Sequence, residues 1–218
     1  CEEPTAIANL RQSDALGLPD ALLPTPNPSP VRRALQYQRM CGGTIALHEE
    51  DPDLSAGSSM HEGEVSLALG MRGMPSIAES VMISRDAAIA GYEGGRIQVQ
   101  HLSAIESIEA VRIAKAGGVQ ITAEVTPHHL CLTDRAVRDL DASKHKMNPP
   151  LRSEADRQAL LEALIDGTID CIATDHAPHA AQEKQVPYEA AMMGVTGLET
   201  AFSSVYTELV VPGTIPLE

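Results

Sequence analysis

The sequence predicts an α/β fold in which parallel strands alternate with helices. Short β-rich runs alternate with longer helical patterns from residue 29 onward, and 43% of the 218 residues are hydrophobic, which is enough for a packed core. Strand–helix–strand units of these lengths are typical of a parallel sheet. Four strands do not close a (β/α)8 barrel, which needs about 250 residues. The sheet is therefore either open and doubly wound or the second half of a barrel.

The expected helices begin at capping or proline residues and end at glycines. Capping boxes, Ser76 with Glu79 and Ser103 with Glu106, start two of them, and Ser153 caps a third. The helices are expected over residues 30–42, 76–91, 103–117 and 154–167.

The expected strands are the β-rich runs between these helices. They cover residues 44–48, 96–101, 119–125 and 170–175. Ile105, Ile108 and Val111 form an apolar stripe that is expected to face the core. The Pro-rich stretch LPTPNPSP (23–30) favours an extended loop.

Charge and cysteine content restrict the class of protein. The formal net charge of −14 speaks against nucleic acid as a partner, because phosphates repel such a surface. No apolar run reaches the roughly 20 residues of a membrane helix, and no signal peptide is visible. The four cysteines form no C-x-x-C pair, which favours reduced thiols and a cytoplasmic protein. The chain opens with Cys1 rather than Met, so we expect it to be part of a longer protein.

Polar side chains stand at the end of each expected strand. The strands deliver His48, His101, Glu124 and Asp175 in turn, and parallel strands place active-site groups at their carboxyl ends. One strand-end histidine is more often structural, but two histidines and an aspartate on separate strands favour a zinc-like ion. Such an ion lowers the pKa of bound water to about 7. Asp175 is the best candidate for moving the proton of that water to a leaving amide nitrogen.

Four motifs together resemble the dihydroorotases of the amidohydrolase superfamily, class I type. They read HEGE at 61–64, AEVTPHHL at 123–130, KMNPPLR at 146–152 and IATDHAPH at 172–179. The resemblance covers roughly residues 24–218. It implies an incomplete TIM-barrel (β/α)8 metal-dependent hydrolase fold, about the C-terminal half of the barrel, over 29–218. An irregular N-terminal segment, 1–28, precedes it.

The resemblance also implies an activity. Dihydroorotases reversibly cyclise N-carbamoyl-L-aspartate to (S)-dihydroorotate in pyrimidine (UMP) biosynthesis, with one or two Zn²⁺ ions per site. They are cytoplasmic and form homo-oligomers, and an association with aspartate carbamoyltransferase is a further implication. Two alternatives remain open. One is another cyclic amidase, such as a hydantoinase or allantoinase, and the other is a non-catalytic dihydroorotase-like partner of the carbamoyltransferase.

The resemblance assigns roles to individual residues. His48 and His101 resemble ligands of the second zinc, and Asp175 resembles the ligand and acid/base residue on the first. The implied substrate contacts are Asn148, His179, Met193 and Gly194. Among the remaining histidines, His128 and His129 are interpreted as packing or supporting groups, and His61 and His145 as solvated loop residues.

The sequence departs from the family pattern in several places. The H-x-H pair of the first barrel strand and the substrate-binding arginine after it are not found here. Ala21 stands where many relatives have a metal-bridging aspartate, unless Asp20 serves instead. No lysine precedes Lys115, which weighs against the carboxylated-lysine bridge of hydantoinases. Gln100 replaces a cysteine that pairs with Glu124 in some relatives, so Glu124 is not assigned to metal.

We predict that these 218 residues alone bind zinc weakly and show no turnover, because an open barrel leaves strand edges unpaired. Zinc titration and an assay for N-carbamoyl-L-aspartate cyclisation test this. Full zinc occupancy together with activity would refute it.

Overall fold

The computed structural model describes residues 9–10, 15–19, 24–138 and 142–217. Its strands are β1 (Gly17–Pro19), β2 (Thr44–Leu47), β3 (Met60–His61), β4 (Gly73–Met74), β5 (Arg96–Val99), β6 (Gln120–Val125) and β7 (Cys171–Ile172). The longer helices are α2 (Pro28–Cys41), α5 (Ile77–Glu93), α6 (Ile105–Ala116) and α8 (Glu154–Ile165). Short helical segments complete it: α3 (Pro52–Ser55), α4 (Glu64–Leu69), α7 (Pro127–Cys131), η1 (Asp134–Arg138), η2 (Ala142–His145), α9 (Ala181–Lys184), η3 (Tyr188–Ala190), α10 (Ala201–Val205) and η4 (Tyr206–Val210).

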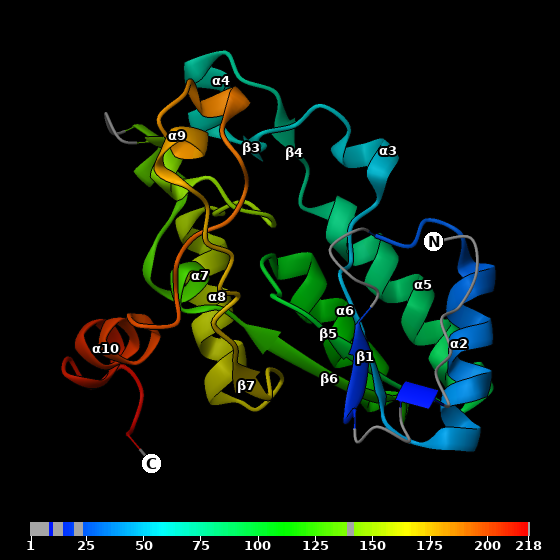
Figure 1. Cartoon of the computed structure of the whole chain (residues 1–218). Coiled ribbons are helices and arrows are strands. Elements are labelled where there is room, and N and C mark those ends of the chain that lie inside the picture. Colours follow the sequence, from blue (N-terminus) through cyan, green and yellow to red (C-terminus); the bar gives the residue numbers. More distant parts are fainter. Residues whose placement is uncertain (1–8, 11–14, 20–23, 139–141, 218) are drawn as a thin grey trace.

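A parallel sheet in the order β1-β2-β5-β6-β7 organises the molecule (Figure 1). A second sheet, made of the two short strands β3 and β4, lies beyond the carboxyl ends of these strands. The register places Leu47 of β2 opposite Val99 of β5. The two strands therefore end at nearly the same level, and the residues that follow them are brought together.

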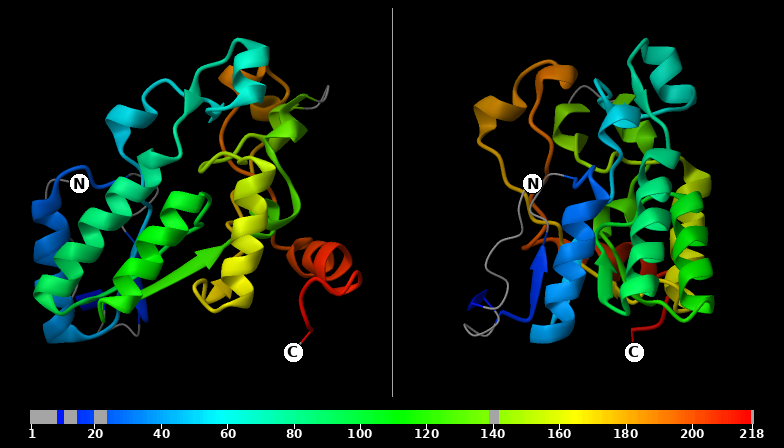
Figure 2. Two further views of the ribbon diagram at one scale, coloured as in Figure 1. Left: turned by 180° about the vertical axis from the view of Figure 1, so that it is seen from behind. Right: turned by 90° about the vertical axis from the view of Figure 1, so that its right-hand side faces the viewer.

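The long helices form one layer against one face of the sheet (Figure 2). Helix α2 packs on α5, α5 on α6, and α6 on α8, in the same order as the strands. Each strand–helix–strand crossover thus returns the chain to the same side, as in the wall of an α/β barrel. The strand–helix alternation predicted from the sequence is confirmed.

The alternation of side chains along the strands separates the core from the opposite face. Ile97 and Val99 of β5 are buried in the core beneath the helices, together with Ile45 and Leu47 of β2. Because successive side chains of a strand point to opposite faces, Gln98 lies on the other face of the sheet. The helix-facing side is thus apolar, while the other side carries polar groups.

Helix α8 begins as predicted, but the two other capping boxes are not formed. Ser153 Oγ accepts from the Asp156 backbone N–H, and the Asp156 carboxylate accepts from the Ser153 N–H. In contrast, Ser76 makes no side-chain cap, and α6 is preceded by Ala104 rather than by Ser103. The reason is that Glu79 accepts hydrogen bonds from Ser103 instead.

Other boundaries also differ from the expectation. Helix α5 continues past Gly91 to Glu93, and Gly94 ends it in the left-handed region at φ 66°. Ile105, the first residue of α6, is 43% exposed and does not face the core, whereas Ile108 and Val111 are buried as predicted. Strand β7 covers only Cys171–Ile172 of the expected 170–175.

Strand β1 adds a fifth strand to the four that were expected. Gly17 pairs with Thr44, and Pro19 with Ala46, at one edge of the sheet. The division into an irregular segment 1–28 and a partial barrel 29–218 stays a prediction, but β1 and the first residue of α2, Pro28, lie inside the former. None of the helices in the described part of the chain is long and apolar enough to cross a membrane.

Truncation of Ile97 tests the importance of the central strand. Ile97 is 1% exposed, so Ile97→Ala leaves a cavity and is expected to lower the free energy of unfolding by about 2–5 kcal/mol. Ile113, which is 64% exposed on α6, provides the control, because Ile113→Ala changes stability by about 0.5 kcal/mol or less. Urea denaturation of both variants measures the difference. Equal losses would contradict the assignment of the core.

Candidate metal centre

Two of the predicted ligands, His48 and His101, meet at the carboxyl ends of β2 and β5. Nδ1 of His48 lies 2.9 Å from Nε2 of His101, and both side chains are buried. Burial, and then the nearby His48, lower the pKa of His101 to about 3. His101 is therefore neutral at physiological pH, which is the form in which imidazole binds a metal.

Glu50, which sequence reasoning missed, sets the orientation of His48. Its Oε2 lies 3.0 Å from His48 Nε2 and 2.6 Å from Asn148 Nδ2. Burial opposes ionisation of Glu50, but hydrogen bonds from His48, Asn148 and Ser55 outweigh it and lower its pKa to about 2. An ionised carboxylate only accepts, so His48 donates through Nε2. In neutral His48 the lone pair then lies on Nδ1, the nitrogen that faces His101.

His101 and Asp175 share an uncommon backbone conformation. Their φ angles are 37° and 46°, and they are the non-glycine residues with positive φ in the described part of the chain. The left-handed region costs an L-residue free energy and persists only where the surroundings enforce it, most often at functional sites. Both residues were predicted as metal ligands from their positions at strand ends.

The left-handed turn at His101 decides where its ring points. Ile97 and Val99 of β5 face the helices, so an uninterrupted strand would also aim residue 101 at the helices. His48 follows Leu47 and lies on the opposite face. The turn redirects the ring of His101 to that face, where the two imidazoles pack edge to face with centroids 4.7 Å apart.

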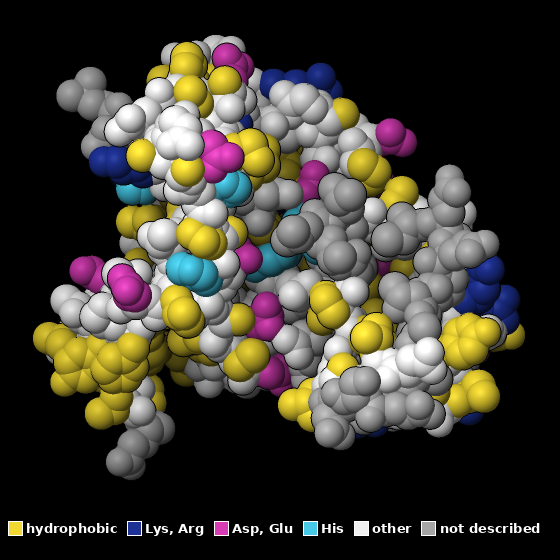
Figure 3. Space-filling model, in the orientation of Figure 1, with side chains coloured by type: hydrophobic (Ala, Val, Ile, Leu, Met, Phe, Trp, Pro, Cys, Tyr) yellow, Lys and Arg dark blue, Asp and Glu magenta, His cyan; other side chains and the backbone are white. Residues whose placement is uncertain are grey.

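Asp175, on the segment that follows β7, interacts electrostatically with His48. Burial raises the pKa of its carboxyl, and electrostatic attraction to His48 partly opposes that rise. Asp175 also raises the pKa of Glu124 on β6, after the larger effect of burial on that residue. In Figure 3, histidine and acidic side chains lie together in the hollow near the centre of the view.

The donor set fits a zinc ion in part. Within the described ranges, no three His, Cys, Asp or Glu side chains are arranged to hold a metal ion. The histidine pair is nevertheless suitable, because two nitrogens on one tetrahedral zinc, each about 2.0–2.1 Å from it, lie roughly 3.3 Å apart. The observed separation is 2.9 Å. The other ring nitrogen of His101, Nδ1, is buried with no hydrogen-bond partner and does not face His48.

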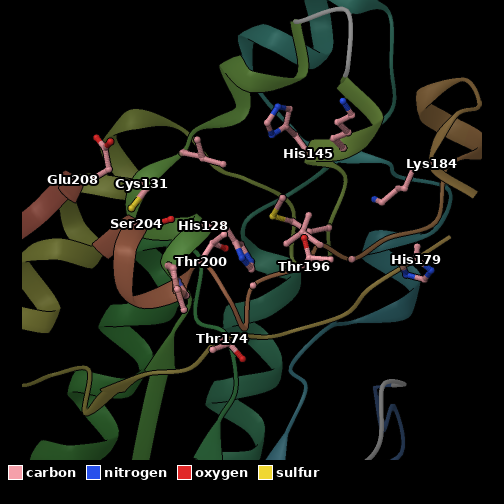
Figure 4. Close-up of a pocket in the computed structure, with 18 of the residues that line it drawn as sticks. His128, Cys131, His145, Thr174, His179, Lys184, Thr196, Thr200, Ser204 and Glu208 are labelled. Atoms are coloured by element: carbon pink, nitrogen blue, oxygen red, sulfur yellow. The ribbon is translucent and has the colours of Figure 1, made fainter. Parts of the chain in front are cut away.

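The four predicted substrate contacts divide between two neighbouring pockets. Asn148 and Met193 line a cavity of about 270 Å³ that Glu50 also lines. His179 and Gly194 line a larger one of about 730 Å³, between α7 and the segment that leads to α10 (Figure 4). His179 Nε2 lies 2.8 Å from the Met193 carbonyl oxygen, so the two pockets share this contact.

The other histidines show a mixed outcome. His129 is buried and bonds Thr126 and the Pro149 carbonyl, as expected of a supporting group. His128 lines the larger pocket with its Nε2 buried and without a hydrogen-bond partner. The expected solvated role of His61 is wrong, because it is buried in β3 with Nδ1 3.3 Å from Arg152.

Some expectations concern residues whose placement is not described. Asp20 and Ala21, the candidates for the bridging ligand, lie outside the described residues. Glu124 contacts Gln98 rather than residue 100. The reading of Glu124 as a residue without a metal role stays a prediction.

Comparison with known proteins finds similarity in sequence to dihydroorotases. A family model described as Dihydro-orotase-like matches residues 1–107. Curated dihydroorotases from Pelotomaculum thermopropionicum and Streptomyces coelicolor are each 49% identical, over 100% and 85% of this chain. The chain spans about half the length of the curated relatives it matches, 51% and 43% of these two. The predicted resemblance to dihydroorotases is confirmed.

Solved structures agree on the fold. A dihydropyrimidinase from Brevibacillus agri NCHU1002 matches with a TM-score of 0.83 at 18% identity, over 100% of this chain and 51% of that one. A Saccharomyces cerevisiae dihydroorotase in complex with 5-fluoroorotic acid matches with a TM-score of 0.70 at 21% identity, over 97% and 59%. The predicted incomplete TIM barrel is thereby confirmed, and of the two alternatives left by the residues alone, the partial barrel is correct.

Substitution of Gly194 tests how the pockets are built. A Cβ at Gly194, whose φ is 134°, would lie 2.7 Å from the Ala177 carbonyl oxygen and 2.9 Å from His179 Nε2. Gly194→Ala is therefore expected to destabilise the chain by well over 1 kcal/mol and to shift the NMR signals of His179. Gly167 also has positive φ but open space around it, so Gly167→Ala should cost only about 1 kcal/mol and leave His179 unchanged. Equal effects would contradict the packing described for Gly194.

Proposed function

We propose that this chain, which is similar in sequence to curated dihydroorotases along its whole length, supplies His48, His101 and Asp175 to the zinc centre of a dihydroorotase. The supporting observation is that two of these residues, His101 and Asp175, hold left-handed backbones in the segments that follow β5 and β7, while His48 and His101 meet at 2.9 Å. Strained backbone conformations of this kind cluster at functional sites. The reaction is the reversible cyclisation of N-carbamoyl-L-aspartate to (S)-dihydroorotate.

The histidines act as neutral ligands whose orientation is fixed in advance. Glu50 accepts the Nε2 proton of His48 and leaves Nδ1 available, which is the usual arrangement of a carboxylate behind a metal-binding imidazole. Burial keeps His101 unprotonated by lowering its pKa to about 3. Zinc, when bound, supplies a Lewis acid and lowers the pKa of a water molecule toward 7.

Asp175 moves the proton in both directions of the reaction. In hydrolysis its carboxylate takes a proton from the attacking water and gives it to the amide nitrogen as the ring C–N bond breaks. In cyclisation the same carboxylate takes the proton from that nitrogen as the ring C–N bond forms, and passes it to the hydroxyl of the carboxyl group, which leaves as water. Burial raises the pKa of Asp175, which brings it closer to the operating pH and suits a group that both accepts and donates.

The substrate contacts follow from the pockets. Asn148 and His179 would donate hydrogen bonds to the anionic substrate, and the backbone of Met193 and Gly194 would line its pocket. Lys144 and Lys184 line the larger pocket as well. These local cations offset the overall charge of −14 at the place where an anion would bind.

The cellular setting is also part of the proposal. Cys41, Cys131 and Cys171 are free thiols, which is consistent with the reducing cytoplasm. We place the reaction there, in pyrimidine biosynthesis, with a homo-oligomeric protein that carries one or two zinc ions per site. Association with aspartate carbamoyltransferase is supported only by the family resemblance.

A chimeric enzyme tests the proposed function. This chain would replace the matching half of the P. thermopropionicum dihydroorotase, to which it is 49% identical. We expect the chimera to cyclise N-carbamoyl-L-aspartate, and Asp175→Asn to lower kcat by about 10²- to 10⁴-fold. Asp166→Asn is the control, because Asp166 caps α8 as an exposed residue and should leave kcat unchanged.

Three outcomes of this assay would contradict the proposal. A folded, zinc-loaded chimera without turnover would favour a non-catalytic partner protein. Turnover of hydantoin but not of N-carbamoyl-L-aspartate would favour a different cyclic amidase. Full activity in Asp175→Asn would remove Asp175 from the proton transfer.

A further inference from the structure

A buried carboxylate, that of Glu79, accepts hydrogen bonds from Ser103, two residues after His101. Glu79, in the first turn of α5, accepts a hydrogen bond from the backbone N–H of Ser103 at 2.9 Å and another from the Ser103 hydroxyl. Glu79 is 2% exposed and Ser103 is fully buried. Hydrogen bonds to a charged group are stronger than neutral ones, and water does not compete for them here.

Arg152 completes this network from the other side. Its Nε donates to Ser103 Oγ at 3.0 Å, and its Nη2 lies 3.8 Å from the Glu79 carboxylate. Its Nη1 donates to the Met74 carbonyl oxygen at 3.0 Å, which connects strand β4 to the network. Ser103 Oγ therefore accepts from Arg152 and donates to Glu79, so the hydroxyl joins the two charges.

The network acts on a short segment whose backbone is fixed on both sides of His101. Gln100 N–H donates to the Leu47 carbonyl at 3.0 Å, and Leu102 N–H donates to the Glu124 carbonyl at 2.8 Å. With the bond from Ser103 to Glu79, three hydrogen bonds surround the left-handed residue. Several hydrogen bonds to the neighbouring residues can hold a strained φ angle that a free chain would not keep.

Stability alone does not account for this arrangement. Arg152 and Glu79 are both about 2% exposed, and Arg152 Nη2 has no hydrogen-bond partner. A buried ion pair contributes little or nothing to stability compared with apolar residues of the same volume. Arg152 also lies four residues after Asn148, which donates to Glu50. The same loop therefore contacts the partner of His48 and the segment that follows His101.

We propose that Glu79, Ser103 and Arg152 are positioning residues that enforce the left-handed backbone of His101 and so hold its imidazole beside His48. None of the three was predicted as a site residue. The inference rests on the proposed function, because His101 must be a metal ligand for the positioning to have its effect on zinc. Its structural part, however, is testable in the metal-free chain.

Two buried serines provide a matched pair of variants in the whole 218-residue chain. Ser103→Ala removes the hydroxyl that joins Glu79 and Arg152, whereas Ser107 is equally buried but its hydroxyl has no hydrogen-bond partner. In the metal-free chain, Ser103→Ala should accelerate amide hydrogen exchange at Leu102 and Ser103 by about tenfold or more. Direct titration with zinc should show that the already weak affinity is lowered by about 10- to 100-fold. Ser107→Ala should change neither quantity.

The outcomes separate the positioning role from the metal assignment. Unchanged exchange in Ser103→Ala would overturn the positioning role. Accelerated exchange with unchanged zinc affinity would overturn the link to zinc, and with it the assignment of His101 as a ligand in the proposed function. Equal changes in Ser107→Ala would show a general loosening of α6 and would also overturn the proposal.

A double variant that removes both buried charges tests the proposal without the instability that either single change would cause. Either single change at Glu79 or Arg152 leaves a buried charge without its partner, which strongly destabilises a protein. Glu79→Gln combined with Arg152→Met removes both charges together, so the chain is expected to keep its melting temperature within a few degrees. Zinc affinity should still fall by about 10- to 100-fold. Affinity equal to that of the unaltered chain would overturn the proposal.

Discussion

The left-handed backbone at His101 is the constraint on which the rest of the site depends. The register of β2 and β5 brings the residues after Leu47 and Val99 to the same level, but strand alternation alone would turn the ring of residue 101 toward the helices. A φ angle of 37° reverses that direction and places Nε2 against Nδ1 of His48. The parallel sheet thus supplies proximity, and one strained residue supplies orientation.

Electrostatic effects then determine the protonation of the two histidines. Glu50 and burial act on the two imidazoles from opposite sides: the carboxylate fixes the proton of His48, and the apolar surroundings keep His101 neutral. In the metal-free chain Nε2 of His101 then donates to the lone pair on Nδ1 of His48, so the loss of that one proton would leave both nitrogens able to bind a metal. The buried network of Glu79, Ser103 and Arg152 stands behind this pair, so the site is supported by charged groups that no water reaches.

Sequence reasoning predicted the fold and proposed the ligands, but it did not identify the residues that orient them. Alternating strands and helices with clear glycine stops placed β2, β5 and β6, and strand ends picked out His48, His101 and Asp175. The prediction failed where a side chain could form either a local hydrogen bond or one with a residue distant in sequence. Glu79 matches a capping box, yet it bonds Ser103 from a distant strand end, and that long-range competition is invisible in local spacing. Glu50, two residues after His48, could have been found by asking which carboxylate orients a strand-end histidine.

The central claim is that the histidine pair faces one metal ion. Anomalous diffraction at the zinc edge, from crystals of this chain grown with zinc, tests it most directly. The account predicts a zinc peak about 2.0–2.1 Å from both His48 Nδ1 and His101 Nε2, with the two nitrogens spread beyond their present 2.9 Å. Zinc bound elsewhere, with the hydrogen bond between the two rings intact, would contradict it.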